Sequence, residues 1–98
     1  MLVAFSISPA VSDESGGVSE AVADAIRVVR ESGLPNETNA MFTNIEGEWD
    51  EVMAVIKRAV DAVAARSPRI ALVLKADIRP GHSGQLSAKV QRIEDALG

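Results

Sequence analysis

Four carboxylate side chains surround the only tryptophan of the chain. They lie in the stretch NIEGEWDEV, in the order Glu46, Glu48, Asp50 and Glu51. Such a group could bind a cation. Alternatively, acids in the first turn of a helix each contribute about 0.3–1 kcal/mol by interacting with the positive end of the helix dipole. This alternative explains the last three acids, whereas Glu46 precedes the predicted helix and is the acid that we single out as a binding residue.

The turn sequence RPGHSG contains His82, the only histidine of the chain. A catalytic base needs an acid to orient it, and none lies within a few residues, so the pattern favours an exposed histidine. A phosphate group could be held by cations and glycine amides of this region, namely Lys75, Arg79, His82, Gly81 and Gly84. We favour the alternative, in which Lys75 pairs with Asp77 and Arg79 is hydrated. No metal-ligand spacing, nucleophile elbow or phosphate-binding loop occurs in the sequence.

The composition predicts a folded protein with an aliphatic core. Of the 98 residues 47% are hydrophobic, which argues against disorder, and only three are aromatic. The net charge of −4 argues against nucleic-acid binding, which needs a basic surface. The absence of cysteine excludes disulfides and fits a reducing compartment. No apolar run is long enough to span a membrane and no basic leader precedes the first one, so we expect a cytoplasmic protein with a single domain over residues 1–98.

Apolar spacing predicts four strands and three helices. Alternating residues predict strands over 2–8, 37–40, 41–46 and 69–79, with a very tight turn between the second and third. Helical spacing predicts helices over 18–32, from 48 to the Ser67-Pro68 pair, and a last one with apolar residues Leu86, Val90, Ile93 and Leu97. Gly17 and Glu20 form half of a capping box for the first helix. Trp49 falls on the apolar stripe of the second helix, and we expect it in the core.

The order of these elements is βαββαβ followed by a helix. This order predicts an α+β, ferredoxin-like fold, with a four-stranded antiparallel sheet and two helices on one of its faces. The other face of the sheet is then uncovered, and the extra C-terminal helix has an apolar seam to bury. Both features predict self-association into a homo-oligomer, because large exposed apolar patches are unusual on soluble monomers.

Strand alternation predicts which side chains lie on the uncovered face. If Val3, Phe5 and Ile45 face the helices, period-two alternation turns a mixed polar group the other way. Its members are Ser6, Ser8, Phe42, Asn44, Glu46, Lys75 and Asp77. A second subunit closing over this face would create a small-molecule pocket with apolar walls and a few polar groups. The pattern alone favours the simpler alternative, a subunit interface in which Lys75 pairs with Asp77 or Glu46.

Several segments together resemble a known family. The segments IEGEWDEVMAVIKRA, MFT, KADIRPG and GQLSAKVQRIEDAL resemble the small MTH1187/YkoF-like thiamine-binding proteins, and the resemblance extends over nearly the whole chain. It implies a ferredoxin-like fold, dimers or tetramers formed through the sheets, and binding of thiamine or its hydroxymethylpyrimidine part without catalysis or a further cofactor. Relatives tend to have serine at the position of Gly17, and any ligand contact of that serine would be missing here.

The resemblance gives the polar group candidate roles. The thiazolium ring of thiamine is permanently cationic, so Glu46 or Asp77 could bind it or the amino group of the pyrimidine. Ring nitrogens could be bound by Asn44, Thr43, Ser6 and Ser8, and Phe42 could stack on the ring. Lys75 lies in the same group, and Thr43 is included although its parity points it toward the helices.

Two other functions remain open from the sequence. One is an ACT-like regulatory module that binds an amino acid or another metabolite at a subunit interface. The other is a small ferredoxin-like dimeric enzyme with His82 as its base. A panel of vitamins and amino acids would separate the first from a thiamine-binding protein, because a ligand at a hundred times its Kd adds about 2.7 kcal/mol to stability.

Overall fold

The computed structural model describes residues 1–10 and 18–98. The element order is the predicted one. The elements are β1 (Leu2–Pro9), α1 (Val18–Glu31), β2 (Asn36–Thr38), β3 (Thr43–Glu46), α2 (Trp49–Ala64), β4 (Ile70–Asp77) and α3 (Gln85–Leu97). The half capping box that involves Gly17 falls outside the described residues.

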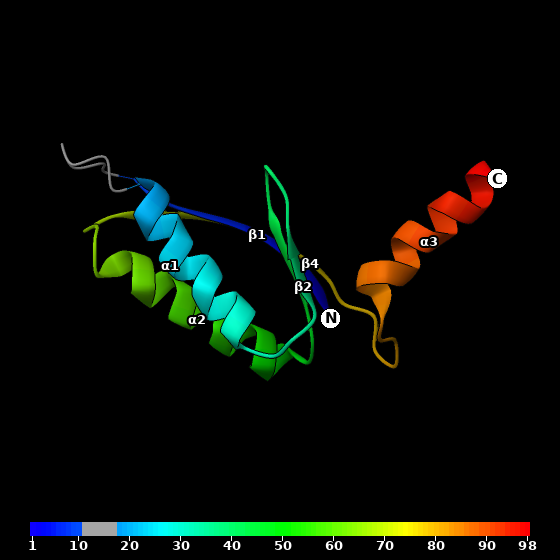
Figure 1. Cartoon of the computed structure of the whole chain (residues 1–98). Coiled ribbons are helices and arrows are strands. Elements are labelled where there is room, and N and C mark those ends of the chain that lie inside the picture. Colours follow the sequence, from blue (N-terminus) through cyan, green and yellow to red (C-terminus); the bar gives the residue numbers. More distant parts are fainter. Residues whose placement is uncertain (11–17) are drawn as a thin grey trace.

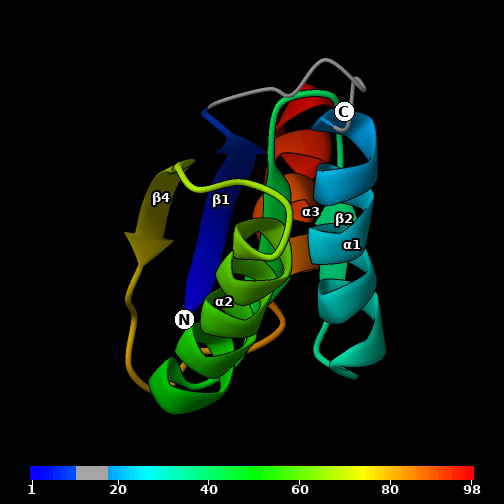
Figure 2. The ribbon, with the colours of Figure 1, turned by 90° about the vertical axis from the view of Figure 1, so that its left-hand side faces the viewer.

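The four strands form one antiparallel sheet in the order β2-β3-β1-β4. Helices α1 and α2 pack side by side on one face of this sheet, and α3 lies on the other side (Figures 1 and 2). We call the face turned away from α1 and α2 the open face. The predicted α+β, ferredoxin-like fold with an additional C-terminal helix is therefore confirmed.

The strand register confirms the predicted alternation. Val3 lies opposite Ile45 on one side and Ala76 on the other, and Phe5 lies between Thr43 and Leu74. Residues directly opposite each other share a face, so this whole set faces the helices. The buried core consists of Val3, Phe5, Ile7, Ala21, Ala25, Val29, Ile45, Val52, Val55, Ile56, Ala59 and Val63. It is built almost entirely from aliphatic side chains, as the composition predicts.

The second and third strands are shorter than predicted, and a loop of four residues joins them. The Oδ1 atom of Asn39 accepts hydrogen bonds from the backbone N–H groups of Met41 and Phe42, both at 2.9 Å. This side chain satisfies backbone donors that a longer ladder would have paired, so pairing begins only at Thr38 and Thr43. Phe42 consequently lies in the loop and not in a strand, which corrects the prediction that it belongs to the strand face.

Trp49 is not a core residue, contrary to the prediction. It is the first residue of α2, and 55% of its surface is exposed. It lines a small pocket with Met1, Ile78 and His82 and is not part of the buried core. The acids nearby do stabilise the helix start, since the Glu51 carboxylate accepts a hydrogen bond from the Glu48 backbone N–H at 3.2 Å.

Helix α3 projects away from the rest of the molecule (Figure 1). None of its residues is buried, and its apolar seam of Val90, Ile93 and Leu97 is exposed. No helix formed by residues 1–10 and 18–98 has the length and apolar character needed to cross a membrane.

Candidate functional site

The structure divides the predicted binding residues between two places. Asn44, Glu46, Lys75 and Asp77 meet at one end of the open face. Ser6, Phe42 and Thr43 line a pocket at the β2–β3 hairpin. Ser8 belongs to neither group, because it lies further along β1, opposite Ala71.

The open-face group is held by two adjacent rows of the sheet. Leu2 lies between Glu46 and Asp77, and Ala4 lies between Asn44 and Lys75. Neighbouring strands are about 4.8 Å apart, so the backbones of the outer residues of each row are about 10 Å apart. The four residues therefore share the predicted face, and their side chains are long enough to reach a common ligand.

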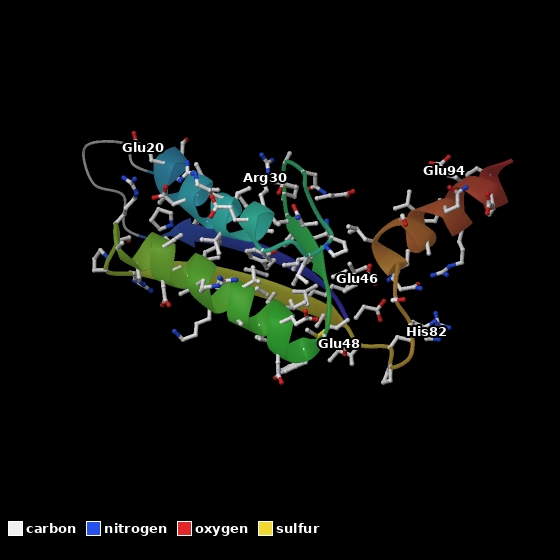
Figure 3. The ribbon with its side chains drawn as sticks, turned by 60° about the horizontal axis from the view of Figure 1, so that its bottom comes forward. Glu20, Arg30, Glu46, Glu48, His82 and Glu94 are labelled. Atoms are coloured by element: carbon white, nitrogen blue, oxygen red, sulfur yellow. The ribbon has the colours of Figure 1, made fainter. Side chains whose placement is uncertain are left out.

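The Glu46 carboxylate already accepts hydrogen bonds from another part of the chain. Its side chain is the buried partner of the first turn of α3: the backbone N–H of Gln85 donates to Oε2 at 2.8 Å, and that of Leu86 donates to Oε1 at 3.0 Å. Only 5% of Glu46 is exposed. Gly84 precedes this helix and has no side chain to satisfy those donors. The carboxylate thus caps α3 from another part of the sequence, as Figure 3 shows.

Asp77 provides the second attachment of α3. The Nζ atom of Lys89 donates a hydrogen bond to its Oδ2 atom at 2.8 Å. This hydrogen bond, and then the charges of Lys89, Arg79 and Lys75, hold the pKa of the Asp77 carboxyl below its usual range. The predicted pairing of Lys75 with Asp77 or Glu46 is not observed. The Lys75 side chain makes no hydrogen bond or ion pair within the described residues.

Acidification should therefore loosen α3. The folded-state pKa of Asp77 is lowered, so its ionised carboxylate stabilises the attachment of α3. This stabilisation is complete above about pH 4 and is lost as the pH falls through the lowered pKa. We expect amide exchange in α3 to accelerate below that pH after correction for intrinsic exchange. Lys89→Met should remove the part of this pH dependence that Asp77 causes. Lys57→Met should leave it unchanged, because the partner of Lys57 is Asp61 on α2. An unchanged pH profile in Lys89→Met would contradict the prediction.

The second place is a pocket at the hairpin. Strand β3 pairs with β1 only as far as Phe5, while β1 continues to Pro9, and the pocket forms where this pairing ends. Its volume is about 190 Å³. The lining residues, which define the hairpin pocket, are Phe5, Ser6, Ile7, Val22, Ile26, Thr38, Asn39, Ala40, Met41, Phe42 and Thr43.

Some of the polar groups of the hairpin pocket are hydrogen bonded to one another or to the loop backbone. The hydroxyl oxygens of Thr38 and Thr43 are 3.1 Å apart and hydrogen bonded, and Thr43 is 4% exposed. The oxygen of the Asn39 amide binds the loop backbone, while its NH₂ group makes no hydrogen bond among the described residues. The pocket therefore offers hydroxyls and an amide donor between apolar walls, an arrangement that suits a small, flat ring with both donors and acceptors.

Sequence reasoning missed Thr38 and Asn39. Both lie within residues 37–40, for which the sequence predicts the second strand. An available signal was the asparagine before a short loop, which is typical of a side chain that hydrogen bonds the backbone two and three residues later.

The cations proposed for a phosphate site are not brought together. Arg79 and His82 line a separate pocket of about 160 Å³ beside Trp49, and Lys75 does not line it. Figure 3 shows His82 in the segment that leads into α3. Within the described part of the chain, no group of three histidine or carboxylate side chains could hold a metal ion.

Comparisons with known proteins agree with this fold. A family model described as thiamine-binding protein matches residues 3–94. A UPF0045 protein of Mycobacterium tuberculosis is 58% identical over 98 residues, which cover 99% of this chain and 94% of the relative. The solved structure of the hypothetical protein MJ1052 from Methanocaldococcus jannaschii shares 33% identity, with a TM-score of 0.83 over 95% of this chain and 94% of that one.

A further solved structure has a related description. It is a Thermotoga maritima protein provisionally assigned to thiamine biosynthesis or salvage. It shares 26% identity with this chain, with a TM-score of 0.76 over 93% of this chain and 97% of its own. The similarity of each of these relatives extends over nearly the full length of both proteins.

Proposed function

The chain belongs to the thiamine-binding protein family, and we propose that it binds thiamine, or the hydroxymethylpyrimidine part of thiamine, without catalysing a reaction. The observation that supports this proposal best is the hairpin pocket, whose walls are apolar and whose polar groups are the Thr38 and Thr43 hydroxyls and the Asn39 amide. Binding of this kind would serve storage, transport or sensing of the vitamin.

The aminopyrimidine ring is the part of thiamine that matches the hairpin pocket. It is flat and has ring nitrogens that accept hydrogen bonds and an amino group that donates them. The Asn39 NH₂ group can donate to a ring nitrogen, and the threonine hydroxyls can donate or accept. Phe42 and Met41 supply apolar surface at the rim, where an aromatic side chain can stack on the ring. Ser6 borders the pocket from β1.

The open face has a different role in this proposal. Asn44, Lys75 and Asp77 are polar groups on a face that also exposes Val73, and a second copy of the chain that closed over it would bury both kinds of side chain. We propose that this residue set lies between protomers of a homo-oligomer, with residues 1–98 of each protomer acting as one domain. Glu46 can meet a cationic ligand there only if α3 releases its carboxylate.

Binding is tested with a panel of small ligands. Thermal-shift and calorimetric titrations should show saturable binding of thiamine and of hydroxymethylpyrimidine, and no binding of amino acids. A preference for an amino acid would overturn the proposal in favour of a regulatory module. Turnover of the bound vitamin, detected by mass spectrometry, would overturn its non-catalytic part.

Thr43→Val should weaken thiamine binding about 5- to 150-fold, because it removes one hydroxyl and leaves its partners unsatisfied at a cost of about 1–3 kcal/mol. Valine has nearly the same shape as threonine, so the fold should persist, which the melting temperature would check. Ser8→Ala is the matched control, because it removes a β1 hydroxyl that lies outside the hairpin pocket. Equal affinities for the wild type and Thr43→Val would remove the hairpin pocket from the proposal.

A further inference from the structure

The hairpin pocket shares three of its lining residues with a larger groove along α1. The groove has a volume of about 790 Å³, within the range of about 300–1,000 Å³ that is typical of small-molecule sites. The residues that define this α1 groove are Val18, Ser19, Val22, Ala23, Ile26, Arg27, Arg30, Glu31 and Thr38. Val22, Ile26 and Thr38 line the hairpin pocket as well, so the two spaces border each other along α1.

The α1 groove has an apolar floor that ends at a cation. Val18, Val22, Ile26 and Arg30 follow one another at intervals of four residues, which places them along one side of α1. Four residues of helix rise by about 6 Å, so Arg30 begins one turn beyond the wall that the two spaces share. In Figure 3 the Arg30 side chain projects from α1 beside the β2–β3 hairpin.

The two arginines that line the α1 groove differ in whether they have an anionic partner. The Nη1 atom of Arg27 is 2.9 Å from Asp24 Oδ1, and Asp24 also accepts from Arg66 at 2.6 Å. Hydrogen bonds from Arg66 and Arg27 hold the pKa of Asp24 below its usual range, so Arg27 has an anionic partner. The Arg30 side chain is exposed, and its guanidinium group makes no hydrogen bond or ion pair among the described residues. Among the residues that the structure describes, Glu31 is the one acidic side chain that lines the groove.

We propose that the α1 groove binds the phosphate group of a phosphorylated form of thiamine, with Arg30 as the residue that pairs with it. This inference rests on the proposed function, in which the pyrimidine ring occupies the hairpin pocket. The rest of the ligand then lies over Val22 and Ile26, and its phosphorylated end reaches Arg30. A guanidinium group matches phosphate in geometry and charge. Unphosphorylated thiamine has a cation and no anion to bring near Arg27 and Arg30, which is unfavourable.

The test compares thiamine with thiamine monophosphate and thiamine diphosphate by isothermal titration calorimetry. The wild type should bind the monophosphate at least about 10-fold more tightly than thiamine, as one charge-assisted contact allows. Arg30→Gln should remove most of this gain and change thiamine affinity by less than about 3-fold. Arg58→Gln is the matched control, because it removes the same charge from an exposed position on α2 that lines neither space.

The other outcomes separate this inference from the proposed function. Equal affinity of the wild type for thiamine and its phosphates, with Thr43→Val still weakening all three, would overturn the phosphate site alone. Equal losses in Arg30→Gln and Arg58→Gln would also overturn it, because they would indicate a nonspecific charge effect. Failure of the wild type to bind any of the three would overturn both. The melting temperature of Arg30→Gln checks the simpler role of Arg30, which is favourable interaction with the C-terminal end of α1.

Discussion

Glu46→Gln releases helix α3 from the sheet while the rest of the chain stays folded. The carboxylate of Glu46 accepts two backbone hydrogen bonds from α3, and hydrogen bonds to a charged group contribute about 1.5–3 kcal/mol each. A glutamine keeps one oxygen, but its NH₂ group then faces a backbone N–H, so one bond is lost and a donor faces a donor. The charge that favours the N-terminus of the helix is lost as well.

Few other interactions among the described residues hold α3 in place. The side chains of Lys89 and Asp77 are both exposed, and an exposed ion pair contributes little because water screens it. No residue of α3 is buried. The free energy lost at Glu46 is therefore larger than the free energy of the remaining attachment. Only α3 should be released, while the rest of the chain stays folded.

Hydrogen–deuterium exchange measures this release residue by residue. The amides of α3 should exchange at least about 10-fold faster in Glu46→Gln, since about 1.4 kcal/mol corresponds to a factor of ten. The amides of α1 and α2 should be unaffected. Glu37→Gln is the control, because Glu37 is an exposed acid on β2 with no hydrogen bond or ion pair in the described part of the chain. Unchanged exchange of α3 would mean that other contacts, such as those of a second copy, hold the helix.

Phe5→Ala lowers the free energy of unfolding by about 3–5 kcal/mol, whereas Trp49→Ala lowers it by about 1 kcal/mol or less. Phe5 is 1% exposed and lies in the middle of the sheet between Thr43 and Leu74, so its removal leaves a cavity. Trp49 is 55% exposed at the end of α2. This contrast reverses the expectation from the apolar stripe alone, which placed Trp49 in the core.

Urea denaturation of both variants measures the difference. The midpoint should shift strongly for Phe5→Ala and little for Trp49→Ala, with similar m-values if both remain two-state. Comparable losses in the two variants would mean that Trp49 is buried in the protein in solution, for example against another protomer.

The layers of the fold were predictable because they depend on local periodicity. Alternation in β1 and β3 places Val3, Phe5 and Ile45 toward the helices wherever the strands pair, and the register agrees. Trp49 shows what periodicity omits: a helical stripe predicts the side of the helix on which a residue lies, but not whether other residues cover it. The hairpin was misplaced because a side chain, Asn39, replaces backbone pairing there.

The candidate site was predictable only in part. Parity correctly placed Asn44, Glu46, Lys75 and Asp77 on one face, but it could not show that Glu46 binds amides 39 and 40 residues later in the chain. Thr43 entered the prediction through the family resemblance, and the structure places it in the hairpin pocket. That pocket arises because β1 is longer than β3, a property of two strands together that neither segment reveals alone. The ligand roles of these residues remain predictions.

The projecting helix also makes the molecule mechanically asymmetric. The Cα radius of gyration is 14.7 Å, compared with about 13 Å for a compact chain of 100 residues. Helix α3 is about 20 Å long and is attached near its first residues, so a tilt of about 10° there would move its tip by about 3–4 Å. A displacement too small to notice at Glu46 is thus magnified at Leu97. The position of the C-terminal end of α3 therefore depends on two carboxylates of the sheet, Glu46 and Asp77.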